Sequence, residues 1–284
     1  MTGRPDAFAT NIISATDALS EQSSGRHVVF LDVRFSPKQQ DFRSDYDNEH
    51  ISGAHHVDLK TQLQGKGGGV NGSRPLPEIA DLQRNVTQWG IRPETLVVAY
   101  SDRTPAAAAR AWFVLQWAGL PDVRYLDGGL AAWKAAGGKT DGELPPEVPG
   151  TFTIAQAGGL PTLSADDVAG YIRAGGPVFD ARGGAEYAGD GSPRSGHIPG
   201  ARSLPSSTLL DAGGLVLKPN EVRAVLDARG ADGADYIGVY CGGGVGGALE
   251  TLALRSAGID ARLFVGSFSA WSADPDRAVA HGSN

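Results

Sequence analysis

The sequence predicts an α/β protein of two similar domains, each with a mostly parallel β-sheet that helices flank on both faces. Two observations predict this fold. The chain contains an internal repeat, and each copy alternates short apolar segments typical of strands with segments whose apolar residues recur at helical spacing. With 284 residues, of which 41% are hydrophobic, the chain is long and apolar enough to form two packed cores.

The repeat consists of four sequence blocks that occur twice, in the same order and at nearly constant spacing. The pairs are Val28–Arg34 with Pro177–Arg182, Glu49–Ala54 with Gly196–Ala201, Leu96–Ser101 with Tyr236–Cys241, and Tyr125–Trp133 with Leu263–Trp271. Such order indicates two copies of one domain. We place the domains at residues 1–145 and 146–284, and we interpret the segment Asp141–Pro161, rich in proline and glycine, as their linker.

Each copy has its own predicted elements. In the first copy we expect strands at Val28–Leu31, Leu96–Tyr100 and Val123–Tyr125, and helices at Pro77–Trp89 and Pro105–Ala118. In the second copy we expect strands at Pro177–Asp180, Ile237–Tyr240 and Arg262–Phe264, and helices at Ser164–Ala174, Glu221–Ala228 and Ala248–Ala257. Thr151–Ile154 is a candidate short strand within the linker. The glycine-rich segment Gly65–Ser73 is expected to be a surface loop, because it lacks the flanking strand and helix of a phosphate-binding loop.

Composition and charge exclude several classes of function. The net charge of −7, without a basic cluster, argues against a nucleic-acid partner. A single cysteine excludes an intramolecular disulfide and fits a reducing compartment. No apolar run is long enough to span a bilayer, and the first residues lack the apolar core of a signal peptide. We therefore expect a soluble cytoplasmic protein with no membrane partner.

The single cysteine, Cys241, lies between a predicted strand and a predicted helix, in a loop that is almost all glycine. The loop residues are Gly242, Gly243, Gly244, Val245, Gly246 and Gly247. Glycine tolerates a positive φ, which we expect at Gly244, so successive N–H groups can converge on an anion. The N-terminus of the following helix adds partial positive charge. A lone cysteine can also be an inert buried residue, and a glycine run a flexible loop. Together, however, these features favour a reactive thiolate at Cys241.

The first copy differs at the equivalent position, where it has Ser101 followed by Asp102 and Arg103 instead of glycines. Without a neighbouring base or a ring of amides, a serine hydroxyl is a weak nucleophile. We therefore expect the first domain to be catalytically inactive.

These blocks resemble the tandem-domain rhodanese family of sulfurtransferases, and the resemblance covers essentially the whole chain. It is carried by the paired Asp-x-Arg and His-Ile-x-Gly-Ala blocks, by Leu-Asp-Gly-Gly followed by tryptophan, and by a cysteine in the second domain only. The resemblance implies two rhodanese-like domains and no metal or organic cofactor. It also implies that Cys241 takes a sulfane sulfur from a small donor and, as a persulfide held by the loop amides, passes it to cyanide, a thiol or reduced thioredoxin.

The resemblance also suggests how a donor would bind. The loop after Cys241 is similar to that of 3-mercaptopyruvate enzymes, whereas thiosulfate enzymes usually place basic residues there, so we expect 3-mercaptopyruvate slightly ahead of thiosulfate. Arg194 would bind the donor carboxylate. Glu186 occupies the place of a second such arginine, and would either repel the donor or point to solvent. Arg182 is a further candidate for donor binding, although we interpret it as structural, because ion pairs are the common fate of arginine.

The resemblance further assigns roles to the first domain. His50 and Asp41 would assist proton transfer together with a hydroxyl at the position of Gly243, and Phe35 would line a cleft between the domains. Because Gly243 has no hydroxyl, that relay cannot operate in its usual form. His50 can instead be a structural histidine that hydrogen-bonds to backbone at a turn.

Two other functions remain open. The missing hydroxyl at Gly243 and the glutamate at Glu186 also fit a slow persulfide carrier or a degenerate binding module. Cysteine phosphatases resemble single rhodanese domains, but they need an arginine six positions after the cysteine, and that position is Gly247 here.

Overall fold

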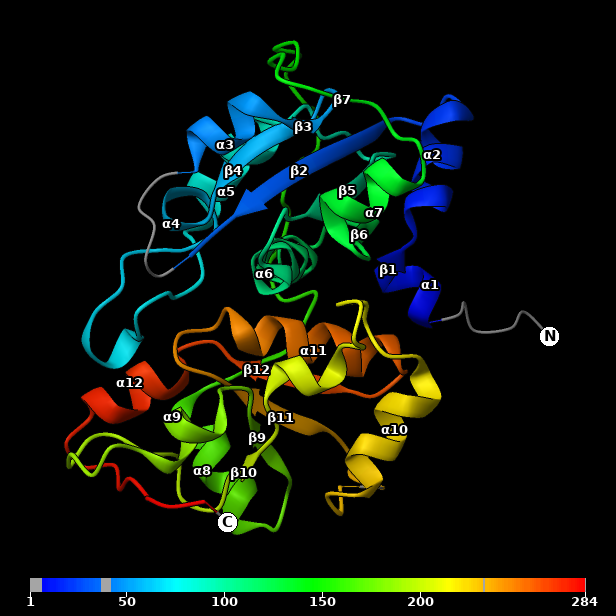
Figure 1. Ribbon diagram of the computed structural model, residues 1–284. Helices are drawn as coiled ribbons and strands as arrows, with labels where there is room; N and C mark the ends of the chain where they lie inside the picture. Colours follow the sequence, from blue (N-terminus) through cyan, green and yellow to red (C-terminus); the bar gives the residue numbers. More distant parts are fainter. Residues whose placement is uncertain (1–6, 37–41, 232, 284) are drawn as a thin grey trace. The chain divides into compact units, whose positions relative to one another are not determined.

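The computed structural model describes residues 7–36, 42–231 and 233–283, which form two compact units. The first unit consists of Met1–Gln64 and Pro77–Leu160, and the second consists of Gly65–Leu76 and Pro161–Asn284. Figure 1 shows a β-sheet with helices around it in each unit. The predicted α/β fold with two similar domains is therefore confirmed.

The first unit contains a five-stranded parallel sheet in the order β1-β6-β5-β2-β4. Its strands are β1 (Ile12–Ile13), β2 (Val28–Arg34), β4 (His55–Asp58), β5 (Leu96–Tyr100) and β6 (Val123–Leu126). A separate antiparallel pair joins β3 (His50–Ile51) to β7 (Thr140–Asp141). The central strands are almost wholly buried and rich in valine, which is typical of parallel sheets covered on both faces.

The second unit repeats this topology. Its five parallel strands lie in the order β8-β12-β11-β9-β10, so each strand has a counterpart at the same place in the first sheet. They are β8 (Thr162–Leu163), β9 (Val178–Asp180), β10 (Arg202–Ser203), β11 (Ile237–Tyr240) and β12 (Ala261–Phe264). The strand that precedes Cys241, β11, is the central strand of the sheet, and its register pairs Tyr240 with Asp180.

Helices connect the strands in both units (Figure 1). In the first unit they are α1 (Ala7–Asn11), α2 (Ala15–Ser23), α3 (Arg43–Asn48), α4 (Leu59–Gln62), α5 (Ile79–Gln88), α6 (Pro105–Trp117) and α7 (Gly129–Ala135). In the second unit they are the short 3₁₀ helices η1 (Gly69–Asn71) and η2 (Ser206–Leu209), with α8 (Ala165–Arg173), α9 (Gly184–Ala188), α10 (Pro219–Asp227), α11 (Gly246–Ser256) and α12 (Ser267–Ala273). Local sequence signals explain where two of these helices begin. Ser164 and Asp167 form a capping box at the start of α8, and a proline occupies the first turn of α6.

The core of the second unit lies on both faces of its sheet. Val178, Tyr240 and Phe264, from the three central strands, pack in one cluster with buried residues of α8 and α12. Leu263 points to the opposite face, because side chains alternate along a strand. There it meets α11 so closely that a Cβ on Gly247 would lie 2.7 Å from its Cδ1 atom. The first unit has an equivalent cluster between its sheet and the helices α2 and α7.

All six predicted strands and all five predicted helices exist, with ends that shift by three residues at most. Thr151–Ile154 forms no strand; its backbone instead hydrogen-bonds to Ile91 and to the Gln83 side chain. The compact units also differ from the predicted boundary between residues 145 and 146. The linker belongs to the first unit up to Leu160, and residues 65–76 belong to the second unit although they lie within the first repeat.

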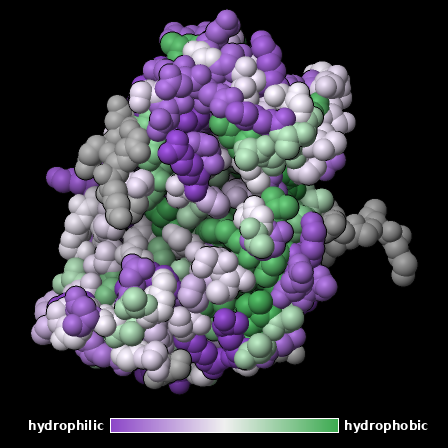
Figure 2. Space-filling model, in the orientation of Figure 1, coloured by the Kyte–Doolittle hydropathy of each residue, from purple (hydrophilic) through white to green (hydrophobic). Residues whose placement is uncertain are grey.

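Hydrophilic residues cover much of the visible surface of each unit and are interspersed with hydrophobic ones (Figure 2). Among the helices in the described part of the chain, none is long and apolar enough to cross a bilayer. Within residues 7–36, 42–231 and 233–283, no three histidine, cysteine or acidic side chains gather in a group that could hold a metal ion.

Candidate functional site

Cys241 lies at the carboxyl end of β11, where ligands bind in parallel sheets of this type. Its side chain is buried, with an exposed fraction of 4%. The loop after it turns at Gly244, whose φ of 79° is the positive value expected from the sequence. This turn brings the Gly244 N–H to the sulfur, to which it donates a hydrogen bond with an N···Sγ distance of 3.0 Å. A backbone donor aimed at the sulfur stabilises its anionic form.

Ser267, the first residue of α12, is a second polar neighbour of the sulfur. Its Oγ lies 3.7 Å from Cys241 Sγ, accepts a hydrogen bond from the Cys241 N–H, and donates one to the Phe264 carbonyl. Ser267 has a φ of 55°, which is strained for a residue with a side chain. Gly129 has the same φ at the equivalent place in the first unit. Ser267 was not predicted from the sequence, although the replacement of glycine by serine between the two copies was a visible signal.

Two glycines at the start of α11 differ in the space around them. A Cβ on Gly247 would come within 2.7 Å of Leu263 and 3.6 Å of Cys241 Sγ, so a side chain there has no room. A Cβ on Gly246 would meet no heavy atom closer than 3.8 Å. Because the first N–H groups of a helix have no partner within the helix, those of Gly246 and Gly247 can serve as donors beside the sulfur.

The loop is fixed from the other side by α12. The N–H of Phe268 donates to the Cys241 carbonyl at 2.8 Å, and the N–H of Ser269 donates to the Gly242 carbonyl at 3.0 Å. These two hydrogen bonds fix the loop that directs the Gly244 N–H at the sulfur.

Arg182 lies beside the loop and is tied to the fold. Its Nε and Nη2 atoms donate to the buried carboxylate of Asp180, and Nη2 also donates to the Gly196 carbonyl. Its guanidinium stacks on the Phe268 ring at 4.2 Å. Arg34 makes the same pair with Asp32 in the first unit, which has no cysteine. This repetition supports a structural role for Arg182, as we interpreted it from the sequence.

Arg194 occupies an unexpected place for a residue that would bind a carboxylate. Its three guanidinium nitrogens donate to the backbone carbonyls of Trp271, Ser272, Asp274 and Arg277, at and beyond the end of α12. Carbonyls at a helix C-terminus attract cations, so this contact stabilises the helix. Donor binding by Arg194 would require it to give up these hydrogen bonds.

The remaining candidates are an acidic residue of the second unit and three residues of the first unit. Glu186 is exposed to solvent and accepts a hydrogen bond from the Gly183 N–H at the start of α9. His50 is fully buried, and its ring nitrogens lie 2.7 and 3.0 Å from the carbonyl oxygens of Tyr46 and Glu143. Such an environment is that of a structural histidine. Phe35 is buried in the first unit, directly after β2, and Asp41 lies outside the described residues.

Ser101, the counterpart of Cys241, sits in a similar turn. Its Oγ accepts a hydrogen bond from the Thr104 N–H at 3.2 Å, just as the sulfur accepts one from the residue three positions later. The next residue is Asp102, whose carboxylate pairs with Arg103. A negative charge beside the hydroxyl opposes formation of an alkoxide, so this geometry offers no activation of Ser101.

The segment 65–76 reaches the loop of Cys241 within the second unit. Gly72 is buried against Gly266, and the N–H of Ser73 donates to Ser269 Oγ at 2.9 Å. A Cβ on Gly243 would overlap Ser73 Oγ and lie 2.9 Å from Arg74 Nη1. The segment is thus more than the surface loop we expected. Ser73 and Arg74 were not predicted, because no local pattern in the segment indicates which surface it packs on.

Glu250, on α11, is the other unexpected residue. It is fully buried, and within the described parts of the chain neither of its carboxylate oxygens has a hydrogen-bond partner. Burial, and then the negative charges of Asp180 and Cys241, raise the pKa of its carboxyl well above the ordinary value. Burial therefore disfavours the charged form of this carboxyl group. A single acidic residue in an otherwise apolar helix was the signal in the sequence.

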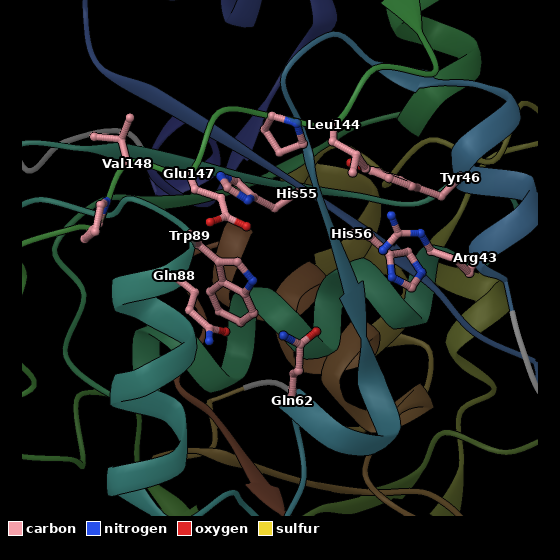
Figure 3. A pocket seen from close by; sticks show the side chains of 12 residues that line it. Arg43, Tyr46, His55, His56, Gln62, Gln88, Trp89, Leu144, Glu147 and Val148 are labelled. Atoms are coloured by element: carbon pink, nitrogen blue, oxygen red, sulfur yellow. The ribbon is translucent and has the colours of Figure 1, made fainter.

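A pocket of about 470 Å³ lies in the first unit, and residues from that unit alone line it. Figure 3 shows His55 and Glu147 on one side of this pocket and His56 with Arg43 on the other. Burial lowers the pKa of both histidines, so they are neutral near neutral pH.

Comparison with known proteins identifies related chains. The sequence matches the rhodanese-like domain family over residues 14–136 and again over residues 164–274. A Mycobacterium tuberculosis protein that carries the provisional name thiosulfate sulfurtransferase SseB is 39% identical over 281 residues, which cover 96% of this chain and 97% of that protein.

Two further relatives carry a different substrate in their names. A Pseudomonas aeruginosa protein provisionally named 3-mercaptopyruvate sulfurtransferase is 38% identical over 274 residues, covering 93% of this chain and 96% of that protein. The crystal structure of SseA from Escherichia coli, described as a 3-mercaptopyruvate sulfotransferase with the rhodanese fold, aligns with a TM-score of 0.79 and 26% identity. That alignment covers 91% of this chain and 98% of the SseA chain.

Proposed function

The chain belongs to the rhodanese family of sulfurtransferases, and we propose that Cys241 carries a sulfane sulfur from a small anionic donor to a thiophilic acceptor. One observation carries this proposal: the only cysteine of the chain accepts a backbone N–H at 3.0 Å, at the end of the central strand and before the buried helix α11. A sulfur in this environment is prepared to act as a thiolate.

The reaction would proceed by two displacements. With thiosulfate, the Cys241 thiolate attacks the outer sulfur, the sulfur–sulfur bond of the donor breaks, and sulfite leaves with the bonding electrons. With 3-mercaptopyruvate, the departing group is the enolate of pyruvate, which takes up the proton of the donor thiol at carbon. In both cases a persulfide anion remains on Cys241. Cyanide or a thiolate, such as that of reduced thioredoxin, then attacks the terminal sulfur and restores the cysteine thiolate.

The two donors differ in the binding groups that they require at the site. The arginine pair that would hold a carboxylate is incomplete, because Glu186 replaces one arginine and Arg194 is bound to α12 carbonyls. The related chains carry both donor names at nearly equal identity, 39% and 38%. We therefore propose that thiosulfate is a donor at least as good as 3-mercaptopyruvate.

Paired kinetics on one preparation test the function. Thiocyanate formation from cyanide is followed with thiosulfate and with 3-mercaptopyruvate, and intact mass shows whether one sulfur atom is added after donor treatment. We expect both signals in the wild type and in the matched variant Ser101→Ala, and neither in Cys241→Ser. Thiocyanate formation that survives in Cys241→Ser would refute the proposal.

A persulfide carrier is the second candidate, and the engagement of Arg194 by backbone carbonyls favours it. A carrier would form the persulfide with either donor but release the sulfur slowly to small acceptors. A phosphatase is disfavoured by the geometry, because Gly247 stands where the phosphate-binding arginine would be, and Leu263 leaves no room there for a side chain.

A further inference from the structure

The pocket of the first unit, with its volume of about 470 Å³, lies at one edge of the parallel sheet. His55 and His56 reach it from β4, the last strand in the sheet order, and Trp89 directly follows α5. The segment 144–149, which contains three prolines, forms a further wall. Small-molecule sites have volumes of roughly 300–1,000 Å³, so this pocket is large enough to enclose an organic ligand.

Trp89 carries a buried donor that has nothing to bind in the free protein. The residue is 2% exposed, yet within residues 7–36, 42–231 and 233–283 its indole N–H has no hydrogen-bond partner. A buried indole N–H usually donates a hydrogen bond. In Figure 3 the indole ring lies next to Glu147 and His55, and the amide of Gln62 lies across the pocket from it. An acceptor atom on a bound molecule would satisfy this donor.

The two histidines bring further polar atoms to the pocket. In the described part of the chain neither imidazole makes a hydrogen bond, and both side chains are half-buried. Burial lowers the pKa of each ring, so near neutral pH each offers one donor and one acceptor. The side-chain oxygen of Gln62 accepts from the Asp58 N–H at 2.8 Å, which leaves its amide nitrogen as a donor. The pocket thus presents donors and acceptors together.

The charges around the pocket do not favour an anion. Glu147 brings a negative charge, and the positive charge of Arg43 is paired with Asp47 at 2.7 Å. An anionic molecule such as a sulfur donor would therefore meet a carboxylate without a surplus of positive charge. Much of the remaining lining consists of flat apolar surfaces, those of Tyr46, Trp89 and the prolines. Such surfaces suit the face of an aromatic ring.

We propose that this pocket binds a flat, uncharged heteroaromatic ring that has both hydrogen-bond donors and acceptors on its edge, in a molecule of about the size of a purine nucleoside. The indole N–H, the imidazoles and the glutamine amides would read the edge of the ring, and the aromatic and proline surfaces would pack on its faces. This binding site goes beyond sulfur transfer, and it gives the first unit, which has no cysteine, a function of its own.

Calorimetry with the full chain tests the class of ligand. Adenosine and inosine are the probes, because each joins a purine ring to an uncharged sugar, and ribose alone is the comparison. We expect at least one nucleoside to bind with a Kd below about 1 mM and to raise the Tm, and ribose to do neither. If neither nucleoside binds or raises the Tm at millimolar concentration, the inference is overturned. Binding of ribose as tight as that of the nucleosides overturns recognition of the ring.

Variants of the lining place the ligand in this pocket. Trp89→Phe keeps an aromatic ring but removes the N–H, and we expect the Kd to rise about tenfold because one hydrogen bond is lost. Gln88→Leu removes an amide from an exposed lining residue and should also weaken binding. The control Gln22→Leu changes an exposed glutamine of α2 in the same unit and should keep the wild-type Kd. An unchanged Kd in both lining variants overturns the assignment. If Trp89→Phe does not fold, as judged by circular dichroism, Gln88→Leu and His56→Leu decide the question.

A last comparison separates this pocket from the sulfur site. Cys241→Ser should bind the nucleoside with the wild-type Kd, and thiosulfate should not displace it. A nucleoside that thiosulfate displaces, or that needs Cys241 to bind, is bound at the sulfur site, and the inference is then wrong. Because none of these measurements involves sulfur transfer, their outcome does not depend on the proposed function.

Discussion

At the scale of single residues, the loop of Cys241 combines positions that accept a methyl group with positions that do not. Gly247 is enclosed by Leu263 and the sulfur itself, whereas a Cβ on Gly246 would make only ordinary van der Waals contacts, at 3.8 Å or more. Gly244 is required for a different reason, because its backbone is left-handed with a φ of 79°. The run of glycines was readable in the sequence, but the different reason for each glycine was not.

Adjacent glycines provide a matched pair of variants. We expect Gly247→Ala to lower kcat/KM by about tenfold or more, because its Cβ displaces Leu263 or the sulfur and misaligns a donor of the nest by part of an ångström. We expect Gly246→Ala to stay within about twofold of the wild type, because its Cβ touches nothing closely. Equal losses in the two variants, measured by thiocyanate formation, would contradict this account.

Gly244→Val tests the turn that directs an N–H at the sulfur. A β-branched residue at a φ of 79° is strained by about 1–3 kcal/mol, and the turn will open to relieve it. We expect activity to fall far more than the free energy of unfolding measured in urea, because the loop can relax while the sheet and α11 remain. Proportionate loss of stability and activity would show that the turn supports the fold and not the sulfur.

Glu250 makes stability depend on pH. Its pKa is raised in the folded protein, chiefly by burial, above the value of 4.5 expected when unfolded. Its contribution to stability is therefore complete below pH 4.5 and is lost as pH rises toward the folded pKa, at up to about 1.4 kcal/mol per pH unit. Relative to the wild type, Glu250→Gln should become more stable as pH rises above 4.5, as measured by urea unfolding. Parallel pH profiles, like those expected for the exposed control Glu94→Gln, would count against a buried neutral acid.

At the scale of elements, α12 makes several contacts that hold the site in place, and its sequence did not indicate them. Its amides hold the carbonyls of Cys241 and Gly242, its Ser267 lies beside the sulfur, and its Ser269 receives the segment 65–76. The helix has only seven residues, so it depends on contacts outside itself. Arg194 supplies one of these contacts at its carboxyl end.

Arg194→Met separates this role from donor binding. If Arg194 stabilises α12, the variant should lose roughly 2–4 °C in Tm for the loss of about 1 kcal/mol, while the KM for 3-mercaptopyruvate stays within about twofold. Arg202→Met is a suitable control, because Arg202 also donates to backbone carbonyls near a helix end, those of Arg229 and Gly230 after α10. A large rise in KM without a change in Tm would restore the carboxylate-binding role implied by family resemblance.

At the scale of the whole molecule, the internal repeat made the fold predictable. Two ordered copies with apolar strands and helical segments were enough to predict both sheets, and Leu96–Tyr100 and Ile237–Tyr240 were predicted with their observed ends. The short edge strands β1, β8 and β10, of two residues each, were missed because two residues show no periodicity.

The site was only partly predictable from the sequence. Cys241 and its glycines are contiguous, so local pattern was sufficient to find them. Ser73 and Arg74 reach the same loop from a much earlier part of the chain, through contacts that depend on tertiary packing and not on propensity. The hydrogen bonds of Arg194 to the carbonyls around the end of α12 could not be predicted, because a motif states which residue is present and not which carbonyls surround it.

The two copies share a sheet order and a turn, so a transplanted thiol tests what makes one of them reactive. Ser101→Cys in the Cys241→Ser background places sulfur where the Thr104 N–H can still donate, since Ser101 accepts that bond at 3.2 Å. The carboxylate of Asp102 follows directly, and the glycine amides are absent. We therefore expect no persulfide by intact mass after thiosulfate treatment and no thiocyanate above background. A persulfide on the introduced thiol would mean that the turn alone activates the sulfur, and that the glycines and α12 contribute little.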